Sequence, residues 1–311
     1  MLLLVGIWVL LNRQFIIDQV TVWQFQPSSS VAALADESGM SERGKFLYYA
    51  SRPELNDRTN FNDNCATREQ QSIVLGCYAA QRIFLFEVTD QRISGIKTVV
   101  AAHEMLHAAY ESLGADETQP LNRLLEDQLA KTTDQDLLDL VEMYEETEPG
   151  QKYNELHSLF ATEVADLSLD LENYYEKYFT DRTKVVKAYQ EYSQVFADLK
   201  NQATVLQSDL KTKEDRIKRL TANYESETTS LASDITAFNA RAQQTDGFGS
   251  MAEFELAREE LLTRQTALTE LSATINDLID EYNDGVVSLN ALGIEIDELN
   301  ESLDSTIQTI E

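Results

Sequence analysis

The segment HEMLH at residues 103–107 places two histidines, His103 and His107, four positions apart, with Glu104 directly after the first. Side chains four residues apart share one face of a helix, so both imidazoles can reach one zinc ion through bonds of about 2.0–2.1 Å. Glu104 then projects beside the ion, where it can accept a proton from an activated water molecule. The apolar residues around the segment predict a buried helix, in which a metal would satisfy both imidazoles.

This segment resembles the H-E-x-x-H motif of the zincin metallopeptidases, and the resemblance covers about residues 80–170. In the metzincin branch a third histidine comes shortly after a glycine, whereas no histidine closely follows Gly114 here. The chain is therefore more similar to the gluzincin branch, which takes its third zinc ligand from a glutamate on a downstream helix. The resemblance implies Zn2+-dependent hydrolysis of amide bonds, with His103 and His107 as metal ligands and Glu104 as the catalytic base.

The segment NELHS at residues 154–158 resembles the gluzincin helix that carries the third ligand, which implies this role for Glu155. Two alternatives lie close by. Glu163 lies about 80° around the same helix, whereas His157 lies about 200° from Glu155, so His157 and Glu155 cannot bind one ion together. Glu163 and Asp166 are candidates for orienting the histidine ligands.

The resemblance implies two further features of the site. Gluzincins commonly add a histidine or tyrosine that stabilises the oxyanion, for which Tyr174, Tyr175 and Tyr178 are the candidates. They also pair an extended substrate with an edge strand beside the active-site helix. The apolar segment RIFLFEV at residues 82–88 is the candidate for that strand.

The composition favours a helical protein with a real core. The chain has 311 residues, 43% of them hydrophobic, and only 11 Gly and 4 Pro, too few for a turn-rich all-β protein. Its 54 acidic and 25 basic side chains give a formal charge of −29. This excess argues against binding to nucleic acid or to anionic lipid, because both select lysine and arginine.

The central part of the chain, residues 46–181, is predicted to form one compact domain after a linker over residues 21–45. Within this domain we expect helices over residues 121–144 and 153–179, separated by a turn at Glu148-Pro149-Gly150.

The last part of the chain, residues 182–311, has the pattern of a coiled coil. Apolar residues recur every seven positions from Leu261 to Leu303, and a weaker repeat precedes them. A glycine-containing turn separates two arms of similar length, at about 182–243 and 251–309, which predicts an antiparallel coiled-coil hairpin. In the alternative arrangement each arm pairs with another chain. Gly285 lies at a seam position and predicts a local soft spot.

The amino terminus carries an uninterrupted apolar run at residues 1–11, within an N-terminal hydrophobic segment of residues 1–20. As a helix this run covers about 16 Å, roughly half of a hydrocarbon core of about 30 Å. The interpretations are a truncated transmembrane helix, an unusual signal peptide or a buried core helix. The first two place the chain outside the cytoplasm. Cys65 and Cys77 are disulfide candidates in such a compartment, and two separate buried thiols are the alternative.

Together these features predict a mainly α protein: a small zincin-like α+β metallopeptidase domain, then a long antiparallel coiled-coil hairpin, with an N-terminal membrane-anchor-like segment. The predicted function is a membrane-anchored, extracytoplasmic zinc metalloendopeptidase. Its expected partners are a peptide or protein substrate, a protein bound by the coiled coil, and the membrane through the N-terminal segment. The alternative is a non-enzymatic cell-envelope scaffold with a structural zinc site and a partner-binding coiled coil.

Overall fold

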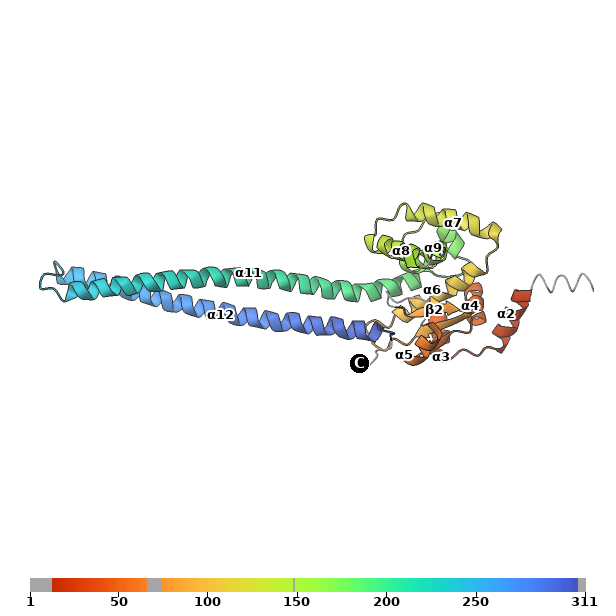
Figure 1. The fold of residues 1–311 in the computed structure, drawn as a ribbon, viewed down its shortest axis with the longest axis horizontal. Coiled ribbons are helices and arrows are strands. Elements are labelled where there is room, and N and C mark those ends of the chain that lie inside the picture. Colours follow the sequence, from red (N-terminus) through yellow and green to blue (C-terminus); the bar gives the residue numbers. More distant parts are fainter. Residues whose placement is uncertain (1–12, 66–73, 148, 307–311) are drawn as a thin grey trace, which may run out of the picture. The chain divides into compact units, whose positions relative to one another are not determined.

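A computed structural model describes residues 13–65, 74–147 and 149–306, and they are mainly helical with a small three-stranded sheet, as the composition predicted (Figure 1). The helices are α2 Arg13–Gln24, α3 Ser29–Glu37, α4 Glu42–Ala50, α5 Arg58–Cys65, α6 Ile96–Glu111, α7 Ala115–Leu129, α8 Gln135–Thr147, α9 Lys152–Glu163, α10 Leu169–Tyr175, α11 Thr183–Ala242 and α12 Met251–Leu303. The strands are β1 Glu54–Asn56, β2 Gly76–Ala79 and β3 Arg82–Phe86.

The sheet has the strand order β1-β3-β2, with β1 parallel and β2 antiparallel to β3. The central strand β3 is buried from Ile83 to Phe86. The prediction that RIFLFEV is an edge strand is therefore wrong, because β3 has a neighbour on both sides. Its unbroken apolar run is typical of a strand covered on both faces, and β2 occupies an edge instead.

Helix α6 lies at the centre of the compact domain. It packs against α9, α4, α3 and the strands β2 and β3. Its small side chains, among them the fully buried Ala101 and Ala102, let these neighbours approach closely. The helix that carries the HEMLH segment is therefore buried, as the apolar residues around that segment predicted.

The structure extends the domain core into the expected linker, residues 21–45. Helix α3 begins at a cap in which the Ser28 hydroxyl accepts a hydrogen bond from the Val31 amide at 3.2 Å. Its residues Val31, Leu34 and Ala35 are buried. Their spacing is that of one helix face, so this segment packs as an amphipathic helix rather than spanning a gap.

Each of the two helices expected over residues 121–144 and 153–179 is interrupted. Asp134 caps α8 by accepting a hydrogen bond from the Leu137 amide at 3.2 Å. Ser168 caps α10 in the same way, from the Leu171 amide at 3.4 Å. Short polar side chains at these positions favour a new helix start over continuation.

Arg182 ties the end of α9 to the helices that follow it. Its guanidinium group donates to the carbonyl of Val164 at 2.7 Å and to that of Ala165 at 2.9 Å. It also reaches the carbonyl of Ala161 at 3.2 Å and forms an ion pair with Glu172 of α10. Carbonyls at the end of a helix have no partner within the helix, so one buried side chain satisfies several of them at once.

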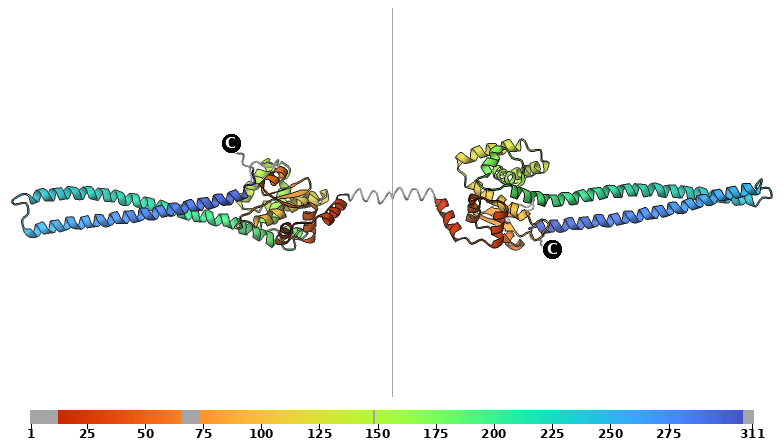
Figure 2. Two further views of the ribbon diagram at one scale, coloured as in Figure 1. Left: turned by 90° about the horizontal axis from the view of Figure 1, so that it is seen from below. Right: turned by 180° about the vertical axis from the view of Figure 1, so that it is seen from behind.

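The chain divides into two compact units, one with residues up to Ala197 and again from Glu298, the other with residues 198–297. In the second unit α11 and α12 run antiparallel, side by side (Figures 1 and 2). Lys213 of α11 pairs with Glu281 of α12 at 3.5 Å, while Asp234, further along α11, pairs with Arg264 at 2.6 Å. Seam residues such as Leu231 and Ile275 are buried. We call residues 198–297 the helical hairpin.

Gly285 has a packing role in the hairpin. A Cβ atom at this position would lie 2.8 Å from Cδ2 of Leu210 on the facing helix. The missing side chain thus makes room for Leu210, which is buried. The glycine predicted to be a soft spot is also a point of close approach between the two helices.

No helix among the described residues is both long and apolar enough to cross a membrane. The apolar run at residues 1–11, on which the predicted membrane anchor depends, lies outside the described residues.

We expect Arg182→Ala to lower the free energy of unfolding by about 3 kcal/mol, because it leaves buried carbonyls and Glu172 without their charged donor. Arg182→Lys keeps the charge but loses the planar guanidinium group with its several donors, so we expect the free energy of unfolding to fall by about 1–2 kcal/mol. Urea unfolding followed by circular dichroism measures both. The matched control is Arg92→Ala, which removes a partly exposed ion pair with Asp90 and should cost less than about 1 kcal/mol. Equal stability of Arg182→Ala and wild type would contradict this account.

Candidate metal centre

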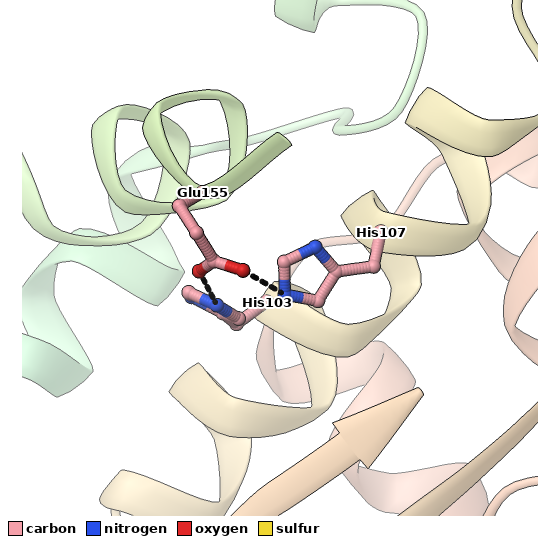
Figure 3. A group of neighbouring side chains, drawn as sticks. All are labelled: His103, His107 and Glu155. Atoms are coloured by element: carbon pink, nitrogen blue, oxygen red, sulfur yellow. Dashed lines mark ion pairs between the residues drawn. The ribbon is translucent and has the colours of Figure 1, made fainter. Parts of the chain in front are cut away.

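Helix α6 places His103 and His107 one turn apart, on the face turned toward α9 (Figure 3). Their rings meet edge to face, with centroids 4.7 Å apart. Both side chains are largely buried, at 15% and 12% exposure. Their shared orientation follows from the four-residue spacing.

Glu155 of α9 faces the two histidines from the opposite helix (Figure 3). One carboxylate oxygen lies 3.5 Å from Nε2 of His103, and the other lies 3.6 Å from Nε2 of His107. The structure thus brings together the three side chains that the motifs indicated. Among the described residues, these three side chains form a group with the spacing of a metal site.

The spacing of these three side chains allows them to hold a metal ion, because each offers one ligand atom and these atoms lie within 4.8 Å of one another. A tetrahedral zinc with bonds of about 2.0–2.1 Å holds its ligand atoms about 3.4 Å apart. Two different carboxylate oxygens of Glu155 lie 3.5 and 3.6 Å from the two imidazole nitrogens. These distances are long for direct hydrogen bonds. The part of the chain that the structure describes supplies three ligands to this cluster, and three protein ligands are typical of catalytic rather than structural zinc sites.

The electrostatics of the cluster also favour a charged carboxylate. Burial by itself raises the pKa of Glu155, but the neighbouring His107 and His103 outweigh burial and lower it. Glu155 is therefore ionised near neutral pH. A deprotonated carboxylate is the form that binds a metal.

Asn154 orients His107. Its side-chain oxygen lies 3.0 Å from Nδ1 of His107. Because an amide oxygen only accepts, Nδ1 carries a proton, and Nε2 is the nitrogen that faces Glu155. Sequence reasoning included Asn154 in the third-ligand segment but assigned the orienting role to Glu163 or Asp166, of which Asp166 is exposed. The position of Asn154 directly before Glu155, with a short side chain that ends in an amide, was the signal that could have indicated its contact with His107.

Neither of the two alternative third ligands, His157 and Glu163, belongs to the cluster. His157 is fully buried on the opposite face of α9, where its ring packs against Tyr110, Tyr174 and Tyr175. Burial lowers the pKa of His157 to about 3, so it is neutral. Glu163 lies at the end of α9 and lines the same pocket as Glu155. Burial raises its pKa, opposed but not cancelled by the charge of His103 and a hydrogen bond from Tyr189.

The histidines and Glu155 open onto a pocket of about 810 Å³. Its walls come from α6, α8, α9, β2 and the first turns of α11, and they include Tyr78, Tyr144, Tyr189 and Tyr192. The tyrosines expected to stabilise an oxyanion do not line this pocket: Tyr174 and Tyr175 surround His157 instead, as does Tyr178. These three tyrosines therefore gather around the buried ring of His157 and not around the two histidines of the cluster.

Gly76 of β2 packs directly against Glu104. A Cβ atom at Gly76 would lie 2.7 Å from Oε1 of Glu104 and 2.4 Å from a methyl carbon of Val100. Glu104 itself is buried and lines the pocket. The lack of a side chain at position 76 therefore leaves room for the Glu104 carboxylate. No sequence motif indicated this contact.

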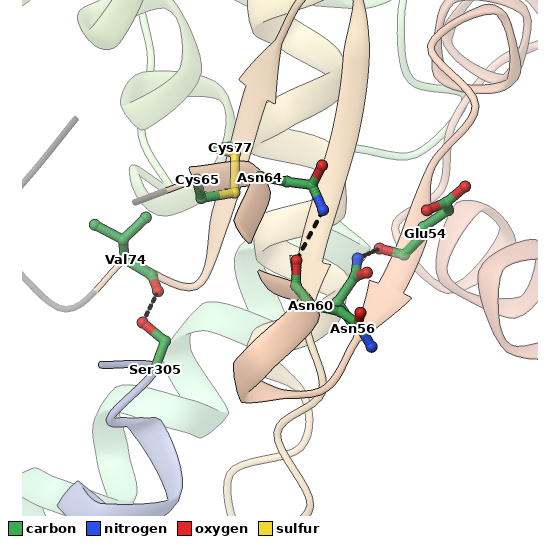
Figure 4. The surroundings of a disulfide bond; sticks show 8 residues. All are labelled: Glu54, Asn56, Asn60, Asn64, Cys65, Val74, Cys77 and Ser305. Carbon is green, nitrogen blue, oxygen red and sulfur yellow. Dashed lines mark hydrogen bonds between the residues drawn. A yellow bond between two sulfur atoms is a disulfide. The ribbon is translucent and has the colours of Figure 1, made fainter. Parts of the chain in front are cut away.

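A disulfide bond joins Cys65 of α5 to Cys77 of β2, as the cysteine spacing suggested (Figure 4). It anchors the strand one residue after Gly76. On the other side of Gly76 the backbone oxygen of Val74 accepts a hydrogen bond from the Ser305 hydroxyl at 2.6 Å. Both attachments hold the β2 wall of the pocket in place.

We expect Asn154→Ala to weaken the binding of added zinc about 10- to 100-fold, because His107 loses its acceptor at 3.0 Å and keeps only the longer contact with the Ser158 hydroxyl at 3.4 Å. Competition with a chromogenic chelator measures the affinity. Asn154→Asp restores an acceptor and should recover most of the loss. The control is Asn64→Ala at an exposed position on α5, which should leave the affinity unchanged. An Asn154→Ala protein with wild-type affinity would rule out the orienting role.

We expect Gly76→Ala to lower the free energy of unfolding by about 1–3 kcal/mol, because the new methyl group overlaps Glu104 and Val100. The control is Gly293→Ala, where a Cβ atom meets nothing within 4 Å and the helix should gain up to about 1 kcal/mol. Urea unfolding of both variants measures the difference. A Gly76→Ala protein as stable as wild type would show that the contact with Glu104 is easily relieved.

No protein-family model matches this chain, and no curated protein or solved structure does. Its function is therefore argued from the geometry and chemistry of the site.

Proposed function

We propose that this chain is a zinc-dependent endopeptidase of the H-E-x-x-H type. The observation that carries the proposal is the cluster of His103, His107 and Glu155, which opens onto a pocket that Glu104 also lines. Three ligands from two helices, an open fourth position and a carboxylate next to the first ligand are the parts that metal-assisted hydrolysis needs.

In this proposal His103, His107 and Glu155 hold a zinc ion, which when bound supplies Lewis-acid chemistry for attack on a peptide carbonyl. Glu104 accepts a proton from the attacking water through its carboxylate and passes the proton to the nitrogen of the leaving amine. Asn154 keeps the proton of His107 on Nδ1, so that Nε2 remains a ligand. A hydroxyl from one of the pocket tyrosines is proposed to stabilise the negative charge on the carbonyl oxygen.

An extended peptide is the proposed substrate. Strand β2 lies at an edge of the sheet and lines the pocket next to α6. Main-chain groups of a peptide can add to such an edge as a further strand. The pocket volume of about 810 Å³ is ample for several side chains.

We propose an oxidising, extracytoplasmic location, supported by the disulfide between Cys65 and Cys77. Residues 1–20 are the proposed membrane anchor. The helical hairpin is the proposed coiled-coil arm for a protein partner. It keeps large apolar side chains exposed to solvent, among them Val205, Val287 and Ile294.

We expect Glu104→Gln to retain the fold and the zinc but to lose about 10²–10⁴-fold in the rate of peptide hydrolysis, because the amide cannot take up a proton. A quenched fluorescent peptide library measures hydrolysis, and elemental analysis measures zinc. A second variant, His103→Ala, separates the role of a metal ligand from that of the catalytic base, because it should lose both the metal and the activity. Hydrolysis by Glu104→Gln at the wild-type rate would contradict the mechanism, and wild-type protein without zinc after reconstitution would contradict the metal site.

A further inference from the structure

The pocket holds more negative charge than the proposed chemistry uses. Glu104, Glu111, Glu155 and Glu163 all line it. A zinc ion balances the charges of the ligand Glu155 and the base Glu104, and two carboxylates remain. Among the described residues that line the pocket there is no lysine or arginine. A substrate in this pocket therefore meets two carboxylates that the pocket walls leave without a cation.

Of these two carboxylates, Glu163 is the one placed to act on a substrate. It lies at the end of α9 and is half-buried, whereas Glu111, at the end of α6, is exposed. Water screens an exposed charge, so Glu111 contributes little to binding. Burial raises the pKa of Glu163, because a charged carboxylate away from water is costly unless donors or a cation compensate it, and Tyr189 provides one donor. A cation bound beside Glu163 would stabilise its charged form.

We infer that Glu163, supported by Tyr189, forms a subsite for a cationic group of the substrate. The inference rests on the peptidase function proposed above. The group is an ammonium or guanidinium, from a Lys or Arg side chain or from a free α-amino end. Its N–H groups donate to the lone pairs of Glu163 that Tyr189 leaves open, and such charge-assisted bonds are the stronger class.

The position of Glu163 sets where this group lies in a bound peptide. Glu163 is eight residues after Glu155 on one helix, which corresponds to about 12 Å along the axis. An extended peptide advances about 3.3 Å per residue. For a peptide that runs along α9, the cation therefore belongs to a residue about two to four positions from the scissile bond.

The test compares matched peptides on the full-length, zinc-loaded protein. One series carries lysine or norleucine at each position up to four residues on either side of the scissile bond, with acetylated ends. A second series carries norleucine throughout, with a free or an acetylated amino terminus. The first series detects a side-chain cation and the second detects an α-amino group. The measured quantity is the ratio of kcat/KM between charged and neutral peptides.

We expect wild type to prefer one charged peptide by about 10- to 100-fold, the range of hydrogen bonds to charged groups. Glu163→Gln should bring this ratio close to one, and Tyr189→Phe should reduce it in part. The matched control, Glu111→Gln, should keep the preference. The inference is overturned if Glu163→Gln keeps the ratio, if it slows charged and neutral peptides equally, or if Glu111→Gln abolishes the preference instead.

Two further measurements separate this inference from the proposed function. Zinc content of Glu163→Gln should equal that of wild type, because loss of the metal would make Glu163 a ligand and overturn the subsite. Peptide affinity is measured by fluorescence anisotropy in the Glu104→Gln background, where cleavage is not needed. There the charged peptide should bind about 10- to 100-fold more tightly than the neutral one, and Glu163→Gln should remove the difference. Equal affinities in that background would overturn the subsite even if cleavage is observed.

Discussion

The buried guanidinium of Arg182 closes the C-terminal end of α9, and the candidate metal centre depends on this helix. A helix of this length is marginal alone, and its last carbonyls need partners from outside. Arg182 supplies donors to several of them and joins α9 to Glu172 of α10 at the start of the chain that leads into α11. With its end closed in this way, α9 can present Glu155 and Asn154 to the histidines of α6. The helix that carries these two side chains is thus stabilised by a cap that lies outside the site.

The polar side chains of the candidate metal centre are tolerated between α6 and α9 because they face one another. Glu155 faces both histidines, and Asn154 accepts from His107. The opposite wall of the pocket is held differently, by covalent and backbone attachments on either side of Gly76. One wall therefore carries the ligands, while the other limits where Glu104 can lie and presents a strand edge. For Glu104 to act on an extended peptide, the two walls must hold the ligands and the peptide in fixed positions relative to each other.

The sequence alone determined those features that depend on residues close together in the chain. The four-residue spacing of His103 and His107 defines a shared helix face, and the segment at 154–158 indicates Glu155. Seven-residue repeats predict the long helices, and a turn between them predicts the hairpin. The spacing of Cys65 and Cys77 allowed a small covalent loop. Each of these signals is local, because helix periodicity and short loops are properties of consecutive residues.

Only the tertiary structure decided which elements meet. Nothing in the order of residues indicates that β3 lies between two strands, or that Gly76 packs on Glu104. The choice among three candidate ligands likewise depends on which face of α9 turns toward α6, and this face is set by the packing of buried side chains around both helices. The same packing puts Tyr189 in the pocket and Tyr175 behind it. These outcomes come from contacts between residues far apart in the chain, for which a single sequence carries no periodic signal.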